Sequence, residues 1–305
     1  NAVDMIDQSQ LVSADLLLQQ STKYSTNSLD FTNANSLLDK CEEVTNSYKK
    51  TKPVIRVIHH LACSGGTLIS KCIASQPNVF LLSEIHPTTK LHLGEGKAKY
   101  TPTDISSQCS FGNLPELTTL KKLLFADEIF CVNSHLISLG GTLVLRDHTH
   151  SDFTFGEACA QHSVLAETLE SKFQLLRLAT IRNPIDSYCS LKSNKWLHFS
   201  PPSFEEYCRR FLIYISEYND EQILKYEDIV ATPELHIEKI TQILQLKYNN
   251  SFEHIFDIHN VSGGSGRKNI QIELPKRREL SNVFVEEINT SKSFLKITKK
   301  FGYEL

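Results

Sequence analysis

The sequence lacks the features that mark membrane-spanning and disulfide-bonded proteins. No apolar run approaches the roughly 18 residues that a membrane span needs, and no signal-peptide pattern opens the chain. The eight cysteines stand singly, with no Cys-x-x-Cys pair, so we expect free thiols in a reducing cytoplasm. Charge is close to balanced, with 32 Lys and Arg against 35 Asp and Glu, which argues against nucleic acid or an anionic membrane as a general partner.

The 305 residues divide by composition into two parts. Residues 1–50 are rich in Ser, Thr, Asn and Gln with short apolar clusters, which predicts a helical or partly ordered N-terminal extension. Residues 51–305 carry the apolar segments of one α/β domain.

Strand patterns alternate with helix patterns along this domain. This alternation of strands and helices indicates a parallel sheet covered by helices on both faces, with ligands bound beyond the carboxyl ends of the strands. The polar stretch 86–112 is predicted to be an irregular loop. Strands are predicted at 53–58, 79–82, 142–145, 175–181 and 222–225, and helices at 67–75, 115–125, 157–172, 185–196, 204–218 and 234–245.

A glycine-rich turn lies between the first strand and the first helix, where residues 61–72 read LACSGGTLISKC. Gly65 and Gly66 permit positive φ and a close approach of the backbone to a ligand. Amides at a helix start favour a phosphate or sulfate, and Ser64 and Thr67 add hydroxyl donors. The alternative is an ordinary strand-to-helix turn capped by Thr67.

The turn is not a Walker A loop, because no Lys-Ser or Lys-Thr follows the glycines. Gly96-Lys97 lacks a hydroxyl residue and a preceding strand. Lys71 lies one helical turn after Thr67 and is either a cation on that face or an exposed helix lysine.

A second motif, RNPIDSYCS, occupies residues 182–190 at the end of a predicted strand. Arg182 offers a planar fork suited to a phosphate, and Ser190 adds a neutral donor in the following helix. Pro184 suits the first position of that helix. The alternative is a well-capped helix with a surface arginine.

Together these motifs resemble the PAPS-dependent sulfotransferase superfamily, where PAPS is 3′-phosphoadenosine 5′-phosphosulfate. The segment ILKYEDIVATPE at 223–234 is similar to the family's LRYEDLVADPE, and SGGSGRK at 262–268 resembles its late loop over the 3′-phosphate. The resemblance spans about residues 53–280. One such motif is weak, whereas four in the right order are specific.

The resemblance implies a P-loop-type parallel sheet, PAPS as cofactor with PAP as product, and direct in-line transfer of a sulfuryl group to a hydroxyl or amine. The acceptor would be a small molecule, carbohydrate or lipid, no metal is required, and the protein would be a monomer or homodimer. The implied cofactor-binding residues are Cys63, Ser64, Gly65, Gly66, Thr67 and Leu68 at the 5′ end, Arg182, Ser190, Arg267 and Lys268 at the 3′ end, and Tyr226 near the adenine.

Sulfuryl transfer needs cations on the charged oxygens and a base for the acceptor proton. Residues 143–150, LVLRDHTH, resemble the family's Lys-Thr-His segment, which puts Arg146 at the cation position and His148 at the base position. Glu84, in LLSEIHP, is a second candidate base, or a structural carboxylate paired with a cation.

Two other interpretations of 147–152 stay open. Asp147, His148, His150 and Asp152 form either a metal site or a plain hydrogen-bonded loop, although alternate residues of an extended segment point to opposite faces.

The sequence also departs from the family. Cys63 stands where a Lys or Arg is usual, and Gly66-Thr67 replaces Thr-Thr. Lys71 or Arg146 would then supply the missing cation, or the protein is slow or inactive. The rivals are therefore a P-loop kinase and a non-catalytic PAP-binding homologue. Acceptor specificity is expected from the loops at 86–112 and 196–204.

Overall fold

A computed structural model describes residues 37–42, 52–89, 91, 102–262, 272–274 and 277–304. By its internal contacts the chain forms two units, Asn1–Lys52 and Pro53–Leu305. In the first unit residues 37–42 are helical, and the rest of the predicted N-terminal extension lies outside the described residues, so that extension stays a prediction. Every strand that the structure describes belongs to the second unit.

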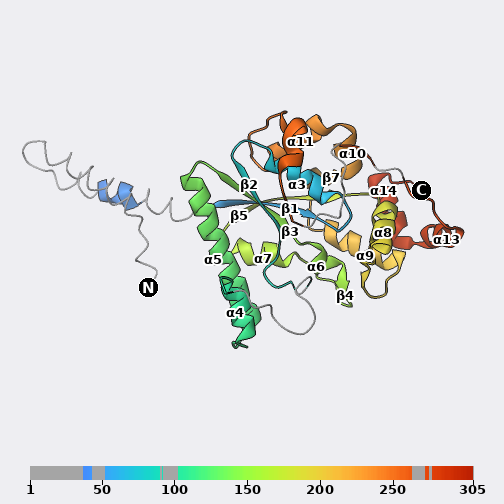
Figure 1. Ribbon diagram of the computed structural model, residues 1–305, viewed down its shortest axis with the longest axis horizontal. Coiled ribbons are helices and arrows are strands. Elements are labelled where there is room, and N and C mark those ends of the chain that lie inside the picture. Colours follow the sequence, from blue (N-terminus) through green and yellow to red (C-terminus); the bar gives the residue numbers. More distant parts are fainter. Residues whose placement is uncertain are drawn as a thin grey trace, which may run out of the picture. The chain divides into compact units, whose positions relative to one another are not determined.

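Five parallel strands form the central sheet, in the order β2-β3-β1-β5-β7 (Figure 1). In the central strand, Ile55, Val57 and Ile58 are fully buried, as expected for a β-branched run covered on both faces. Because every strand runs the same way, all carboxyl ends meet at one edge of the sheet. The strands are β1 Val54–His60, β2 Val79–Ile85, β3 Thr142–Asp147, β5 Gln174–Ile181 and β7 Ile223–Lys225.

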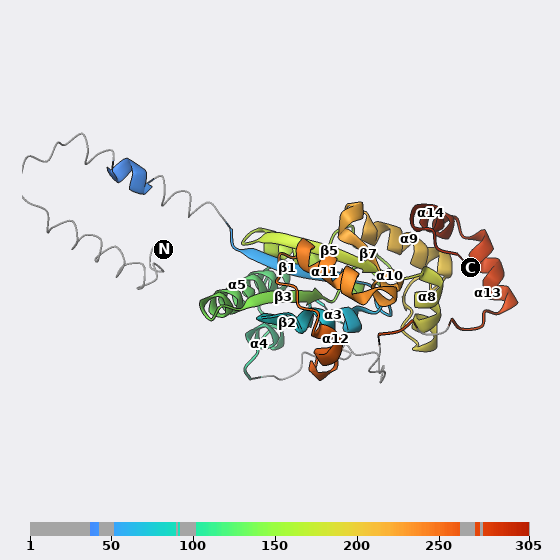
Figure 2. The same cartoon turned by 90° about the horizontal axis from the view of Figure 1, so that it is seen from above.

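Helices cover both faces of this sheet, and alternate residues of each strand point to opposite sides. Val144 packs with the helices of one face, whereas its neighbours Leu143 and Leu145 pack with those of the other. Figure 1 shows these layers on either side of the sheet, and Figure 2, turned by 90°, looks onto the face that carries α11. The first face carries α3 Gly66–Ala74, α10 Tyr226–Ala231, α11 Pro233–Ile243, α12 Phe252–Ile255 and the short η2 Phe256–Ile258, and the second carries α5 Leu117–Ser138 and α7 Val164–Glu170.

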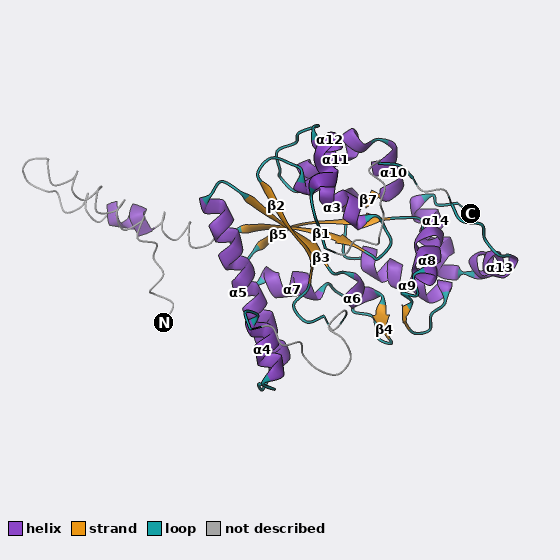
Figure 3. Ribbon diagram, viewed as in Figure 1, coloured by secondary structure: helices purple, strands orange, loops and turns teal. Residues whose placement is uncertain are grey.

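A third core lies beyond the sheet, among helices grouped at the right in Figure 3. The rings of Tyr188, Phe204 and Phe284 pack against one another there, with centroids 5.3 to 5.5 Å apart. The elements are α8 Pro184–Ser193, α9 Phe204–Ile215, α13 Asn282–Thr290 and α14 Lys292–Phe301, with the two-residue strands β4 Phe155–Gly156 and β6 His198–Phe199 nearby.

The structure corrects three of the predicted elements. The helix predicted over 157–172 covers only Val164–Glu170, because Ser163 caps it by accepting a hydrogen bond from the Ala166 amide. The predicted loop 86–112 contains the helix α4, Ile105–Phe111, capped by Asp104. The helix predicted over 115–125 runs on to Ser138. Among the described residues, none of the helices combines the length and apolar character that crossing a bilayer requires.

Candidate active site

The turn after β1 is tightly folded. Cys63 and Gly65 both have left-handed backbones, with φ of 63° and 87°. The buried Ser64 hydroxyl donates to the carbonyl of Leu61 at 2.7 Å, so it stabilises the turn itself. The Leu68 amide donates to Gly65 O at 3.0 Å, and the Leu68 side chain is buried in the core. Both groups of this predicted cofactor residue therefore stabilise the fold.

The two glycines are required by their neighbours. A Cβ on Gly65 would lie 2.2 Å from the ring of Tyr226, and one on Gly66 would lie 2.0 Å from His60 Nε2. Gly65 is the N-cap of α3 and no side chain caps this helix, so the alternative of a cap by Thr67 is wrong. A helix start with no side-chain cap offers its first amides, and the positive end of its dipole, to an anion.

Arg182 reaches this turn from the end of β5. Its Nη1 donates to Cys63 O at 3.1 Å, and its guanidinium lies 5.3 Å from the centroid of the Tyr226 ring. Tyr226 is the first residue of α10 and is buried. The first, second and third sequence motifs therefore meet at one place on the carboxyl edge of the sheet.

A basic pair that was not predicted from the sequence lies against α8. Arg278 Nη1 donates to Cys189 O at 3.1 Å, next to Ser190, and Arg277 pairs with Asp186 at 3.3 Å. The adjacent arginines late in the chain were the available signal. The predicted Ser190 hydroxyl donates to Asp186 O at 2.8 Å.

Of three other predicted site residues, the structure describes only Lys71. Arg267 and Lys268 lie outside the described residues. The ammonium of Lys71 lies 3.5 Å from the carbonyl oxygen of Asp257 in η2. Its role as the missing cation therefore stays a prediction.

Cys63 carries no charge to replace the family's cation. Burial raises the pKa of its thiol, an effect that contacts with Asn194 and Arg182 oppose. Its sulfur lies 3.7 Å from the Asn194 amide nitrogen. The thiol therefore stays neutral at neutral pH.

Glu84, Arg146 and His148 form a cluster at the ends of β2 and β3. Glu84 Oε1 lies 2.5 Å from Arg146 Nη2, and its Oε2 lies 3.4 Å from His148 Nε2. Burial lowers the pKa of Arg146, and the Glu84 carboxylate opposes that shift. Glu84 also has a left-handed backbone, with φ of 57°, at an irregularity in β2, which is strain of the kind that gathers at functional sites.

His60 joins this cluster from the end of β1 and was also not predicted from the sequence. Arg146 Nε donates to His60 Nε2 at 2.7 Å. Burial, reinforced by the Arg146 charge, lowers the pKa of His60 well below its usual value, so the ring is neutral and its proton sits on Nδ1. That buried nitrogen has no partner within the described part of the chain. The histidine pair directly before the turn was the signal.

The four-residue metal site considered for 147–152 does not form. Asp147 Oδ2 lies 3.0 Å from His59 Nδ1, and Asp152 Oδ1 lies 2.9 Å from His86 Nε2. Burial would raise the pKa of Asp147, but its bond with His59 outweighs burial and lowers it. The two carboxylates thus serve separate structural pairs.

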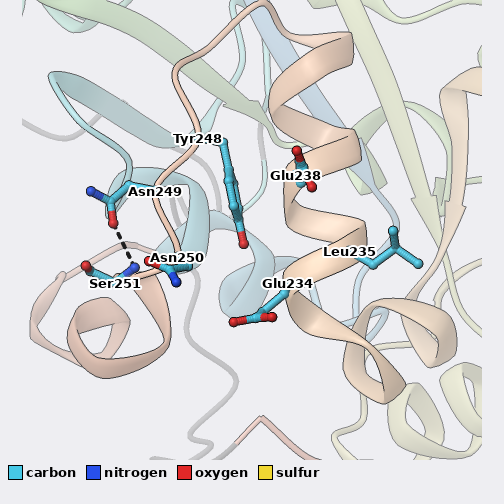
Figure 4. A pocket seen from close by; sticks show the side chains of 7 residues that line it. All are labelled: Glu234, Leu235, Glu238, Tyr248, Asn249, Asn250 and Ser251. Carbon is cyan, nitrogen blue, oxygen red and sulfur yellow. Dashed lines mark hydrogen bonds between the residues drawn. The ribbon is translucent and has the colours of Figure 1, made fainter.

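A surface pocket of about 640 Å³ lies elsewhere, between α11 and the segment after it (Figure 4). It presents Glu234 and Glu238 beside Tyr248, and Asn249 Oδ1 accepts from the Ser251 amide at 2.8 Å. None of its lining residues belongs to the turn or to the Glu84 cluster. Two carboxylates and no cation make it unsuited to a phosphorylated nucleotide.

No protein-family model and no curated protein matches this sequence. Solved structures match the fold. The sulfotransferase domain from the curacin biosynthetic pathway is 17% identical, with 84% of this chain and 100% of that chain covered and a TM-score of 0.51. The sulfotransferase domain from the Synechococcus PCC 7002 olefin synthase is 16% identical, with 84% and 97% covered and a TM-score of 0.48. Mouse sulfotransferase SULT7A1 complexed with PAP is 14% identical, with 81% and 82% covered and a TM-score of 0.38.

The likeness to the curacin-pathway domain shows that the chain has a sulfotransferase-like fold. The predicted α/β class, a parallel sheet flanked by helices, is confirmed.

Proposed function

We propose that this chain is a PAPS-dependent sulfotransferase that moves a sulfuryl group to a hydroxyl or amine of a small-molecule, carbohydrate or lipid acceptor. The observation that carries the proposal is the meeting of Arg182, Tyr226 and the uncapped glycine turn at one edge of the sheet. A nucleotide phosphorylated at both ends of its ribose needs anion-binding groups at two neighbouring points, and this edge offers both.

The residues present fit such a nucleotide. No side chain caps α3, so the first backbone amides of this helix would hold the 5′ end. Arg182, Ser190 and Arg278 would hold the 3′-phosphate, with Tyr226 near the adenine. Arg267 and Lys268 stay in this proposal as residues of the late loop.

PAPS would supply the sulfuryl group, and the chain's own residues would stabilise the charge on the transferred group and accept the proton of the acceptor. His148 would accept the proton of the acceptor at Nε2, which Glu84 Oε2 faces at 3.4 Å, and Glu84 would stabilise the imidazolium. We place Glu84 second as a base because its other oxygen is already paired with Arg146 at 2.5 Å. Arg146 would stand as the cation near the transferred group in place of the family's lysine.

Calorimetric titration with PAP tests the nucleotide part. We expect PAP to bind without magnesium, and Arg182→Ala to weaken it by about tenfold to a hundredfold, the value of charge-assisted hydrogen bonds. Binding of ATP with magnesium but not of PAP would instead support a kinase.

Transfer of labelled sulfate from PAPS to a pool of candidate acceptors tests the chemistry. His148→Ala should lower turnover by about a hundredfold or more while leaving PAP affinity nearly unchanged. If Glu84→Ala abolishes transfer and His148→Ala does not, Glu84 is the base.

A second candidate function is non-catalytic PAP binding, which the neutral Cys63 at the usual cation position favours. It would show as PAP binding with no transfer to any acceptor.

A further inference from the structure

A carboxylate and two histidines converge beside the candidate base. Glu84, His148 and His150 each offer one ligand atom, and these atoms lie within 4.8 Å of one another. Ile85 pairs with Asp147 at the ends of the parallel strands β2 and β3, and of their chain neighbours Glu84 and His148, Glu84 Oε2 lies 3.4 Å from His148 Nε2. His150 is the first residue of helix α6, His150–Phe153. The centroid of the His150 ring lies 3.8 Å from that of the His148 ring.

Two of these three candidate ligands are oriented by side chains that are not themselves ligands, as metal ligands in proteins usually are. Arg146 Nη2 holds Glu84 Oε1 at 2.5 Å, which leaves Oε2 directed to the cluster. Ser151 Oγ lies 3.3 Å from His148 Nδ1, which leaves Nε2 facing Glu84. Glu84 and His148 are thus already held in place before any metal binds.

The spacing of Glu84 and His148 suits a small tetrahedral ion, and all three ligand atoms lie within 4.8 Å of one another. Zinc bonds of roughly 2.0 to 2.1 Å separate two tetrahedral ligand atoms by about 3.3 Å. Glu84 Oε2 and His148 Nε2 are 3.4 Å apart, which is long for a hydrogen bond but close to that separation. Two imidazoles and one carboxylate suit zinc rather than magnesium or calcium, which prefer oxygen ligands.

We infer that Glu84, His148 and His150 bind a zinc-like divalent ion that inhibits the enzyme. The ion would occupy the Nε2 lone pair with which His148 accepts the acceptor proton. His150 is partly exposed, so the fourth coordination position can open to solvent. Metal binding stands on the cluster alone, whereas inhibition rests on the proposed sulfotransferase function.

Titration of the full chain with Zn²⁺, after treatment with a chelator and without nucleotide, tests the binding. We expect saturable binding that His150→Asn weakens by about a hundredfold or more, because loss of a mere outer-shell partner already costs about tenfold to a hundredfold. His150→Cys, which keeps a zinc ligand, should bind nearly as well as the parent. His254→Gln is the matched control, because His254 is an exposed histidine of α12 away from the cluster.

The same variants separate the two claims. His150→Asn should keep PAP affinity and transfer activity while losing inhibition by Zn²⁺, and a chelator should restore activity of the inhibited parent. Absence of Zn²⁺ binding by the parent, or equal binding by the His150→Asn and parent chains, would overturn the inference. Zinc binding together with failure to bind PAP would keep the metal site and reject the sulfotransferase function.

Discussion

At the scale of single residues, the turn before α3 is shaped by side chains from other elements. Tyr226 packs against the position of Gly65, and His60 packs against that of Gly66. Both side chains are buried, so neither has room to move away from an added Cβ. Position 65 therefore requires glycine for two reasons: its backbone is left-handed, and the Tyr226 ring occupies the place of a side chain.

Gly65→Ala should destabilise the fold by about 2–4 kcal/mol, from backbone strain plus overpacking, and weaken PAP at least tenfold. Gly140→Ala is the matched control, since Gly140 has φ of 75° but open space around its Cβ position. Gly140→Ala should lower the free energy of unfolding by about 1 kcal/mol and leave PAP affinity unchanged. Urea unfolding and calorimetry measure both, and equal effects of the two variants on PAP affinity would contradict the account.

Residue types and their order were enough to single out the glycines, Arg182 and Tyr226, which the structure brings together, although their role in binding stays a prediction. His60 and Arg278 were missed. The histidine pair before the turn was a signal for His60, but only the pairing of β1 with β3, with Ile58 opposite Arg146, reveals what lies beside it. The adjacent arginines were a signal for Arg278, but its contact with α8 depends on how the chain folds.

At the scale of elements, α9 anchors the loop between α6 and α7. Arg210 on this helix is completely buried, and its guanidinium donates to Gly156 O at 3.0 Å and Glu157 O at 2.8 Å. It also pairs with Glu206 at 2.6 Å. These bonds explain why the helix predicted from residue 157 does not form there, because the carbonyls that would extend it bind a side chain from elsewhere in the chain.

Arg210→Met should lower the free energy of unfolding by about 3–5 kcal/mol, because it leaves Glu206 and buried carbonyls without their partner. Arg209→Met is the control: Arg209 bonds the same carboxylate, but its side chain is 47% exposed. It should change stability by less than about 1 kcal/mol. Denaturant unfolding of both variants makes the comparison, and similar losses would refute a special role for Arg210.

The start of α14 is held to α9 by Glu205, which accepts from the hydroxyls of Ser291 and Ser293 at 2.6 Å each. Burial raises the pKa of Glu205, but these bonds outweigh burial and lower it below its usual range. The stability it contributes is therefore present above the ordinary carboxyl pKa and is lost as pH falls through the folded value. The stability difference between the parent and Glu205→Gln should shrink on acidification from about pH 6, as followed by urea unfolding; a constant difference would contradict this.

At the scale of the whole molecule, alternation of strands and helices predicted the parallel sheet and its covering on both faces. It did not predict the order β2-β3-β1-β5-β7, since strand order depends on which crossovers pack, not on local pattern. The third core around α8, α9, α13 and α14 was also missed, because no helices were predicted after residue 245. Strands that are far apart in the sequence meet at the carboxyl edge of the sheet. The residues that surround the candidate site there therefore depend on the strand order and on the third core, neither of which local sequence patterns predict.

All described residues of the candidate site belong to the unit Pro53–Leu305. A chain beginning at Pro53 should therefore fold and bind PAP within about twofold of the full-length affinity, since no described residue of the site belongs to the first unit. Calorimetry on the two chains tests this. A folded truncated chain that binds PAP more than about tenfold more weakly would place part of the site in the segment before Pro53.

The proposed function depends most on the claim that the glycine turn and Arg182 hold the two phosphorylated ends of one nucleotide. A crystal structure with PAP bound measures this directly. We predict the 5′-phosphate at the amides of Gly65 and Gly66, and the 3′-phosphate within hydrogen-bond reach of the Arg182 guanidinium. PAP bound at any other surface of the chain, or with Arg182 turned away from both phosphates, would contradict the account.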